Sequence, residues 1–529
     1  MNIKFCFIVI ISLVLTSHAA LAQQRSVKRG MCWDESTQPL TDAPISKMAP
    51  GVSWYYNWGQ TPQAASVTLI GTTDGIDFVP MCWNGAFNET ALREYLTLHA
   101  QPSTLNPYLL GFNEPNLAWN VGGAQMTPQQ AADAWPAVRR VAQDFGLQLV
   151  APALNFSGDQ VGGRVWSPFE WYDEFFRLCP DSSIDFLAFH SYMNWYSAVS
   201  WVASEYFYTD ANDNLFSASN RAKYPHLVQF MDDYLAAHGH YPRMLLTEFC
   251  SGEGNKDGYV SSVDSQIDQM TQKVQKLEQS DMVAGYAWFM GNTSQAPSQY
   301  PYNSVFQSNT PAAELSELGR VYVYMSSFDA EKYYTPGEQI LAKDYINAST
   351  DGQQAKVRSN SESGSSIPLQ VEWQSGAWTA YQVSLPEDGD YTLTLHIKST
   401  ADNRFRIYQG ALGAANKKLD TTLASTAGAW ADVTTTVTLP GGQQTLLLYN
   451  MGTSSIFVNS LRFDAAATGI ANVNPNAQPS TLHAQQYYTL DGRIINSPSS
   501  FLPPPSSGHP ASKHPSSIVI HNGKKIIIH

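Results

Sequence analysis

The sequence predicts a (β/α)8 TIM barrel followed by an antiparallel, jelly-roll-like β-sandwich and a C-terminal tail. Three observations lead to this prediction. Eight short apolar runs recur between residues 29 and 290, each typical of a strand buried on both faces. Helical patterns lie between several of these runs, as in a parallel sheet covered by helices. From about residue 339 the chain changes to short alternating runs with turn signals, which is typical of a sandwich.

Each strand candidate of the barrel is a short stretch of apolar residues with few breaks. In chain order they are RGMCW (29–33), GVSWYY (51–56), DFVPMCW (77–83), YLLGF (108–112), QLVAPA (148–153), IDFLAFH (184–190), RMLLT (243–247) and VAGYAWFM (283–290). Continuous apolar character, rather than strict alternation, is expected of parallel strands with helices on their outer side.

Three helices are expected from pattern and capping. Residues 127–145 begin with a Thr cap and Pro at the first helical position, although Pro136 should kink this helix. Residues 262–278 place apolar side chains on one helical face, and residues 311–328 form a closing helix. A doubly wound open sheet would fit the same alternation, but nothing in the sequence resembles its GxGxxG turn, so the barrel is favoured. We expect it to span residues 25–330.

The sandwich is expected over residues 339–464, which are rich in Thr, Val, Leu and Tyr. Its strand candidates are 378–385, 391–397, 405–408, 431–439, 444–449 and 456–463, separated by turns such as PEDGD and PGG. Residues 465–485 are a polar linker. In residues 486–529, two strand-like pieces flank a Pro/Ser-rich insert.

Composition and the N-terminus restrict the class of protein. Charged residues make up 14% and aromatics 12%, which suits a neutral ligand with flat apolar faces, such as a sugar, or equally an aromatic-packed core. A net charge of −14 argues against nucleic acid as a partner. Residues 1–22 combine Lys4, an apolar stretch and Ala20-Leu21-Ala22, the pattern of a cleaved signal peptide. We expect a secreted protein, at the cell surface or in the periplasm, with no membrane span.

The cysteines are expected to be free. Cys6 lies in the signal peptide, which leaves Cys32, Cys82, Cys179 and Cys250. Their spacing matches no metal site, and strand spacing places Cys32 about 10 Å from Cys82, too far for a disulfide. No metal site and no cofactor are implied.

Two glutamates follow predicted strands at positions where a carboxylate is unexpected. Glu114, in YLLGFNEPN, lies just past the fourth strand, and Glu248, in LLTEF, lies just past the seventh. Reacting residues of a (β/α)8 barrel lie at the C-terminal ends of its strands, and these two ends face each other across the barrel. Glycoside hydrolysis requires two carboxyl groups that flank one bond. The alternative interpretation is a pair of salt-bridge partners at the barrel mouth.

The catalytic region resembles the retaining glycosidases of clan A, and within them glycoside hydrolase family 128, which comprises secreted endo-β-1,3-glucanases. The resemblance lies in the ordered stretches KRGMCW, GVSWYYNWG, DFVPMCWN, YLLGFNEPN, LVAPALNF, IDFLAFHSYM, LLTEFCSG and YAWFMGN, which span residues 28–328. It implies that Glu114 is the acid/base and Glu248 the nucleophile, with carboxyl groups about 5–5.5 Å apart.

The resemblance also implies further site residues. Asn113 would bind the 2-hydroxyl of the reacting sugar, His190 and Tyr192 would support the site, and Trp288 would form a platform under the sugar. Further subsites could be lined by Asn57, Trp58 and Trp83. The alternative interpretation is that His190 is a core histidine and that the tryptophans only pack.

The sandwich resembles carbohydrate-binding module family 6 through LAKDY, SGAWTAYQVSLPEDGDYTLTLHI and GAWADVTTTVTLPGGQQTLLLY…FVNSLRF. The resemblance implies sugar binding by Trp430, Asn459 and Trp373, or by Tyr381 in place of Trp373. Lys343 stands where the family often has a calcium-binding Glu, which puts that ion in doubt. The alternative is a sandwich that binds nothing. The tail YTLDGR…NGKKIII resembles sorting segments of the type IX secretion route, which implies secretion machinery as a partner.

The sequence therefore predicts a secreted retaining endo-β-1,3-glucanase that binds the polysaccharide β-1,3-glucan. The alternatives are a clan A enzyme acting on another β-glycan and a non-catalytic carbohydrate-binding surface protein.

Overall fold

The computed structural model describes residues 23–63, 67–99, 107–156, 159–192, 218–251, 260–292, 302–350, 352 and 354–466, and four strand segments between 487 and 528. The chain divides into two compact units, Met1–Ala466 and Ala467–His529. The predicted signal peptide, residues 1–22, lies outside the described residues. No helix within the described ranges combines the length and apolarity that crossing a membrane requires.

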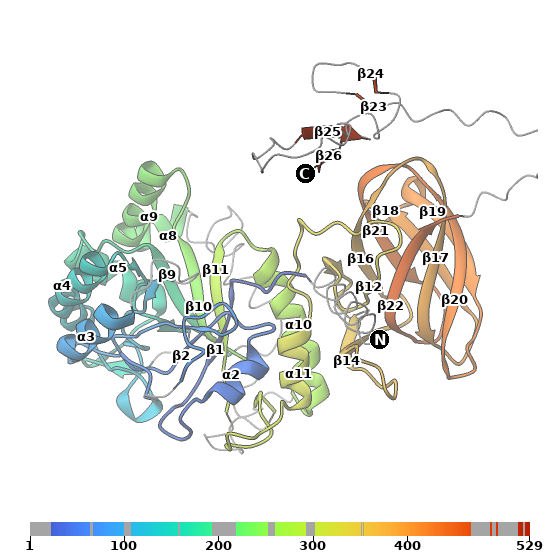
Figure 1. Cartoon of the computed structure of the whole chain (residues 1–529). Helices are drawn as coiled ribbons and strands as arrows, with labels where there is room; N and C mark the ends of the chain where they lie inside the picture. Colours follow the sequence, from blue (N-terminus) through green and yellow to red (C-terminus); the bar gives the residue numbers. More distant parts are fainter. Residues whose placement is uncertain are drawn as a thin grey trace, which may run out of the picture. The chain divides into compact units, whose positions relative to one another are not determined.

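A parallel sheet forms the first half of the larger unit (Figure 1). Seven strands hydrogen-bond in the order β3-β2-β1-β11-β10-β9-β6. Their bounds are β1 Arg29–Cys32, β2 Trp54–Tyr56, β3 Asp77–Phe78, β6 Leu154–Asn155, β9 Phe186–Ser191, β10 Arg243–Phe249 and β11 Val283–Trp288. β4 (Tyr108–Leu109) and β5 (Gln148–Leu149) pair in parallel with each other.

Single parallel bridges connect the shorter strands to their neighbours. Met81 pairs with Leu110, Asn113 with Ala153 and Val150 with Phe186. All eight predicted strand runs therefore contain residues in parallel pairing, and β1 pairs with both β2 and β11.

Helices cover the outer side of the sheet (Figure 1). They are α2 Asp42–Met48, α3 Glu89–His99, α4 Pro128–Phe145, α5 Pro168–Leu178, α8 Ala218–Lys223, α9 Pro225–His238, α10 Val263–Gln279 and α11 Glu317–Tyr324. The predicted Thr127 cap is present, because its side chain accepts from the Gln130 amide. The closing helix is shorter than the predicted 311–328, because it begins only at the Ser316 cap and ends before Met325.

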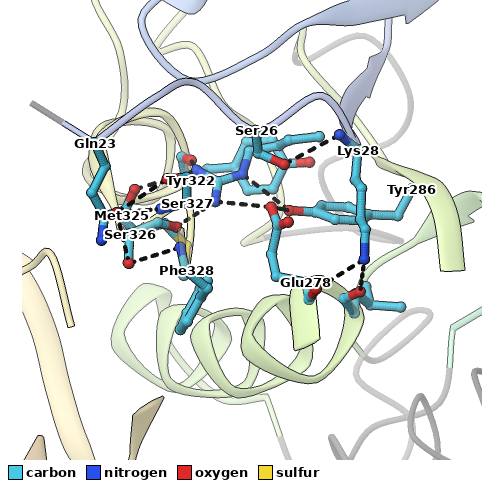
Figure 2. Close-up of polar contacts among 12 residues, drawn as sticks. Gln23, Ser26, Lys28, Glu278, Tyr286, Tyr322, Met325, Ser326, Ser327 and Phe328 are labelled. Carbon is cyan, nitrogen blue, oxygen red and sulfur yellow. Dashed lines mark hydrogen bonds and ion pairs between the residues drawn. The ribbon is translucent and has the colours of Figure 1, made fainter. Parts of the chain in front are cut away.

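The amino end of β1 is tied to α10 and α11 by a buried polar network. The Arg29 guanidinium donates to the Ser326 carbonyl at 2.6 Å and the Tyr322 carbonyl at 2.9 Å, and lies 3.4 Å from the Glu278 carboxylate. Figure 2 shows Glu278 beside Tyr286, whose hydroxyl donates to it at 2.5 Å. The network joins β1 to β11 and to the helices α10 and α11.

The second half of the larger unit is an antiparallel sandwich, as predicted. One sheet has the order β14-β15-β22-β17-β20 with β12 on β22, and the other has the order β13-β16-β21-β18-β19. The bounds are β12 Ile340–Leu341, β13 Asn347–Ala348, β14 Ala355–Ser359, β15 Leu369–Trp373, β16 Trp378–Leu385, β17 Gly389–Lys398, β18 Asn403–Gln409, β19 Lys417–Leu423, β20 Trp430–Leu439, β21 Gly442–Asn450 and β22 Ile456–Ala465.

The smaller unit contains a four-stranded sheet of order β24-β23-β25-β26. Its strands are β23 Tyr487–Tyr488, β24 Ile494–Ile495, β25 Ser517–His521 and β26 Lys524–Ile528. β23 and β26 fall within the two predicted strand-like pieces, β25 begins one residue before the second piece, and β24 lies just past the first. The sorting role of the tail stays a prediction.

Candidate active site

The two glutamates singled out in the sequence come together at the C-terminal edge of the parallel strands. Glu114 follows β4 in a left-handed backbone conformation (φ 42°), and its amide donates to the Ala153 carbonyl at 2.8 Å. Glu248 lies within β10 rather than past it, because this strand continues two residues beyond the predicted end. Both side chains are buried, with 8% and 5% of their surface exposed.

His190 lies between the two carboxylates. Its Nδ1 is 2.7 Å from Glu114 Oε1 and 3.3 Å from Glu248 Oε2, and its Nε2 is 2.9 Å from Thr247 Oγ1. Burial lowers the pKa of His190, but Glu248 and Glu114 outweigh this effect and hold the pKa above the ordinary histidine value. The side chain is fully buried and has a polar partner on each ring nitrogen, so it fixes the relative position of the two glutamates.

Three hydrogen-bond donors surround the carboxylate of Glu248. Tyr192 donates to Oε2, and the Trp58 indole and the Tyr56 hydroxyl donate to Oε1 at 2.8 and 3.1 Å. Burial raises the pKa of Glu248, His190 opposes this rise, Glu114 adds to it, and the Tyr192 and Trp58 hydrogen bonds again oppose it; the net shift is upward. The donors are arranged to stabilise the ionised form of Glu248 at this buried position.

The carboxylate of Glu114 has a different partner. Asn155 donates its side-chain amide to Glu114 Oε1 at 2.6 Å. Asn155 is itself fixed by Asn116, whose side chain exchanges two hydrogen bonds with the Asn155 backbone. Neither Asn155 nor Tyr56 was among the predicted site residues. Their signal was their place at the end of the fifth and second strand runs, where side chains reach the same edge as Glu114 and Glu248.

The two predicted asparagines differ in availability. Asn113 donates to the Gly122 carbonyl at 3.1 Å, while its buried Oδ1 has no hydrogen-bond partner among the described residues, so this oxygen is a free acceptor beside Glu114. Asn57 is fully engaged: Nδ2 donates to Glu35 and Thr61, and Oδ1 accepts from the Gly59 amide. Asn57 therefore shapes the turn that carries Trp58, and its place in a sugar subsite stays a prediction.

The aromatic residues at this edge include one that the prediction misplaced. Trp288 is fully buried, packs against Phe249 and Tyr322, and donates to the Asn303 carbonyl, so it cannot serve as a sugar platform. Side chains alternate along β11, and the next residue, Phe289, is the partly buried one. Its ring centroid lies 6.0 Å from that of Trp58 and 5.4 Å from that of Tyr192.

Trp83 is also partly buried and packs, like Trp58 and Phe289, on the apolar cluster formed by the inward-facing strand residues. Its ring makes an edge-to-face contact with Trp119, at a centroid distance of 4.9 Å. Trp119 belongs to the short helix η1 (Trp119–Val121) and is 63% exposed.

In the sandwich, the structure leaves one of the three predicted sugar-binding residues accessible. Trp373 is fully buried and donates to Thr379 Oγ1, and Asn459 is fully buried and donates to Glu362. Both expectations are therefore corrected. Tyr381, the alternative to Trp373, is also fully buried. Trp430 is partly exposed and stacks on His396 at 5.7 Å.

Three features concern metal binding and thiols: the cluster of Glu114, His190 and Glu248, the position of Lys343, and the cysteines. Glu114, His190 and Glu248 offer donor atoms within 4.8 Å of one another, close enough to hold a metal ion. Each of these groups has hydrogen-bond partners in the protein, which account for the cluster without an ion. Lys343, at the family's calcium position, donates to Asp344. Within the described residues, Cys32, Cys82, Cys179 and Cys250 form no disulfide with one another.

The chain is similar to known proteins over the region that contains this site. Residues 30–322, more than half of the chain, match a family model described as glycosyl hydrolase catalytic core. Alkali-sensitive linkage protein 1 of Schizosaccharomyces pombe is 25% identical over 305 residues, 56% of this chain and 44% of that protein, so the chain spans less than half of this relative's length.

Solved structures are similar to each half of the larger unit. A glycoside hydrolase family 128 (subgroup II) endo-β-1,3-glucanase from Pseudomonas viridiflava is 30% identical, over 57% of this chain and 98% of that chain, with a TM-score of 0.40. A β-1,3-glucan-binding module of family 6 from Bacillus halodurans is 22% identical, over 25% of this chain and 100% of that chain, with a TM-score of 0.22.

Proposed function

Since the chain belongs to the glycosyl hydrolase catalytic core family, we propose that it is a secreted, retaining endo-β-1,3-glucanase. The observation that carries the proposal is the buried pair Glu114 and Glu248, with a donor atom of each and of the intervening His190 all within 4.8 Å of one another. A short separation of the two carboxyl groups is the geometry of double displacement, because an inverting enzyme needs room for a water between its carboxylate and the sugar.

In the first step, Glu248 is the nucleophile. A carboxylate oxygen of Glu248 forms a bond to the anomeric carbon while the glycosidic bond breaks, and its electron pair goes to the leaving oxygen. Glu114, as general acid, gives that oxygen a proton. The products are a covalent glycosyl-enzyme and the shortened glucan, whose new non-reducing end carries the proton.

In the second step, the ionised Glu114 is the general base. It removes a proton from a water molecule, the water oxygen bonds to the anomeric carbon, and the ester bond to Glu248 breaks. Both glutamates return to their starting state and one water is consumed. Asn155 and His190, which both contact Glu114 Oε1, keep that carboxyl group oriented through its change of charge.

The substrate class is supported by sequence similarity. The eight resembling stretches span residues 28–328, and the identity of 30% covers 98% of the Pseudomonas endo-β-1,3-glucanase. We therefore place β-1,3-glucan of the laminarin type first. We further infer that the eight parallel segments close into a (β/α)8 barrel, which is supported by the pairing of β1 with both β2 and β11.

Export is proposed from the ends of the chain. Residues 1–22 would direct secretion and be removed, and residues 486–529 would be recognised by secretion machinery of type IX. Amino-terminal sequencing of the exported protein should start at Gln23. A mature protein that still carries the leader would contradict this part of the proposal.

The reaction is tested by incubating the mature protein with laminarin and following new reducing ends. Glu114→Gln and Glu248→Gln should each reduce turnover by at least about 10³-fold at unchanged melting temperature, while the exposed Glu387→Gln serves as a matched control. Proton NMR of the first product should show the β-anomer. An α-anomer would refute retention, cleavage of only another β-glycan would refute the substrate, and binding without cleavage would refute the enzyme.

A further inference from the structure

The aromatic side chains at the site fall into two groups around the two glutamates. In the first group, the ring of Phe289 contacts the rings of Trp58 and Tyr192. Trp58 and Tyr192 both donate hydrogen bonds to Glu248. Trp83 and Trp119 form the second group, which belongs to the Glu114 side: the Trp83 carbonyl accepts from the amide of Asn113, the residue before Glu114.

Trp119 is exposed although its loop is well fixed. The Asn113 carbonyl accepts from the Ala124 amide at 2.8 Å, and the Pro115 carbonyl accepts from the Met126 amide at 3.0 Å, so both ends of the loop are tied to the Glu114 turn. The Trp119 amide itself donates to the Gln125 side chain at 2.9 Å. A large apolar side chain held 63% exposed on an ordered turn beside a reactive site is typical of a binding surface rather than of packing.

The ring contact between Trp83 and Trp119 leaves apolar surface for a ligand. Their planes are 84° apart, and an edge-to-face contact uses one face of only one ring. The remaining exposed area of Trp119 therefore includes indole surface. The flat apolar face of a glucosyl unit is complementary to such a surface, and two perpendicular rings suit a chain that bends from one unit to the next.

The chemistry of the two glutamates decides which end of a glucan this surface would meet. The general acid gives its proton to the oxygen that leaves, so the departing saccharide lies on the side of Glu114. Glu248 bonds to the other side of the broken link. We propose that Trp119, supported by Trp83, is the binding platform for sugar units on the leaving-group side of the scissile bond. This inference rests on the proposed glucanase function.

The test compares two substrates that differ only on the leaving-group side. A laminari-oligosaccharide places sugar units there, whereas a β-laminaribiosyl fluoride places only a fluorine atom. Trp119→Ala should lower kcat/KM for the oligosaccharide by at least about tenfold, and for the fluoride by less than about twofold. Trp119→Tyr should restore most of the oligosaccharide rate, because it keeps an aromatic face. Val121→Ala, on the same turn and 55% exposed, is the matched control.

Each outcome distinguishes the platform from other roles of Trp119. Equal losses on both substrates would show that Trp119 only holds the Glu114 turn, and unchanged rates on both would show that it binds nothing; either overturns the inference. A melting temperature close to that of the wild type is required for Trp119→Ala; if it is not met, Trp119→Leu, which also lacks an aromatic face, gives the same comparison. A wild-type protein inactive on both substrates would instead refute the proposed function.

Discussion

Trp58 donates its indole hydrogen to the carboxylate of Glu248 at 2.8 Å, across 190 residues of sequence. Trp58 has a left-handed backbone (φ 59°), and the preceding Asn57 donates at 2.6 Å to Glu35, which is buried. Glu35, which follows β1, thus fixes the turn after β2 through its hydrogen bond with Asn57. The pKa of Glu248 therefore depends on residues from several strand ends. The pH dependence of activity can test this dependence.

Removing the hydrogen bond from Trp58 or from Tyr192 to Glu248 should move the acid limb of the pH–activity profile to higher pH. The Trp58 and Tyr192 hydrogen bonds lower the pKa of Glu248, so Trp58→Phe or Tyr192→Phe should raise that pKa further. As the proposed nucleophile, Glu248 must be ionised, so activity should be lost as the pH falls through its pKa. The midpoint of the acid limb of kcat/KM should therefore shift to higher pH. Trp378→Phe, in the sandwich, should leave it in place. A shift to lower pH would contradict the hydrogen-bonding role.

Lys273 should make stability depend on pH. It is fully buried on α10, donates to the Cys250 carbonyl at 3.0 Å and to Ser251 Oγ at 2.5 Å, and burial lowers its pKa to about 7. An unfolded lysine titrates near 10.4. Between these values the unfolded chain binds more protons than the folded one, so this residue makes stability rise with pH, by up to about 1.4 kcal/mol per unit.

In the Lys273→Met variant, the free energy of unfolding should rise less steeply with pH, because the contribution of Lys273 is lost. Urea unfolding at pH 7, 8 and 9 measures it, with Lys276→Met on the same helix as the control that keeps the wild-type slope. Loss of the two Lys273 hydrogen bonds adds a constant offset to the free energy of unfolding, which does not change its slope against pH. Parallel stability curves for wild type and Lys273→Met would show that the lysine is not neutralised on folding.

The buried network at the amino end of β1 should be sensitive to loss of one partner. Arg29→Met removes the guanidinium beside the buried Glu278 carboxylate, which keeps the hydrogen bond from the Tyr286 hydroxyl (Figure 2). This should lower the free energy of unfolding by about 3–5 kcal/mol, and the double variant Arg29→Met/Glu278→Leu should recover a large part. The exposed pair Lys47–Glu314 is the control, and Lys47→Met should cost less than about 1 kcal/mol. A double variant less stable than Arg29→Met would contradict this account.

Trp430 is the accessible one among the predicted sugar-binding residues of the sandwich. Trp430→Ala should weaken binding to insoluble β-1,3-glucan by about tenfold or more, because an aromatic anchor is lost. Trp373→Phe should lower stability and leave binding unchanged, because Trp373 is fully buried. Co-sedimentation with the glucan measures both, using protein inactivated by Glu248→Gln. Undiminished binding by Trp430→Ala would indicate that the sandwich does not hold glucan through this residue.

The strand runs and the two glutamates were predictable because they depend on local pattern. Apolar runs identify buried parallel strands, and a carboxylate at the end of such a run, as at Glu114, is unusual enough to indicate chemistry. The family match confirms a glycosyl hydrolase catalytic core over residues 30–322. The roles given to individual residues stay predictions until the variants are measured.

The errors have one physical cause: an apolar run does not reveal which side chains face inward. The resemblance implied a platform at Trp288, and the run VAGYAWFM, in which every residue is compatible with either side, could not show that Phe289 is the partly buried residue instead. The sequence around Trp373 likewise could not show that this residue is fully buried. Asn155 was missed for a separate reason, because a hydrogen bond to a residue distant in sequence, Glu114, decides its role.

The ring of donors around Glu248 has a consequence for synthesis. If Glu248 is replaced by Gly or Ser, Tyr56, Trp58 and Tyr192 still point into the space that its carboxylate occupied. Three donors in that position suit the departing halide of an α-glycosyl fluoride. A protein altered in this way would be unable to cut the polymer and would instead join activated oligosaccharides into longer chains, with Glu114 accepting the proton of the incoming hydroxyl.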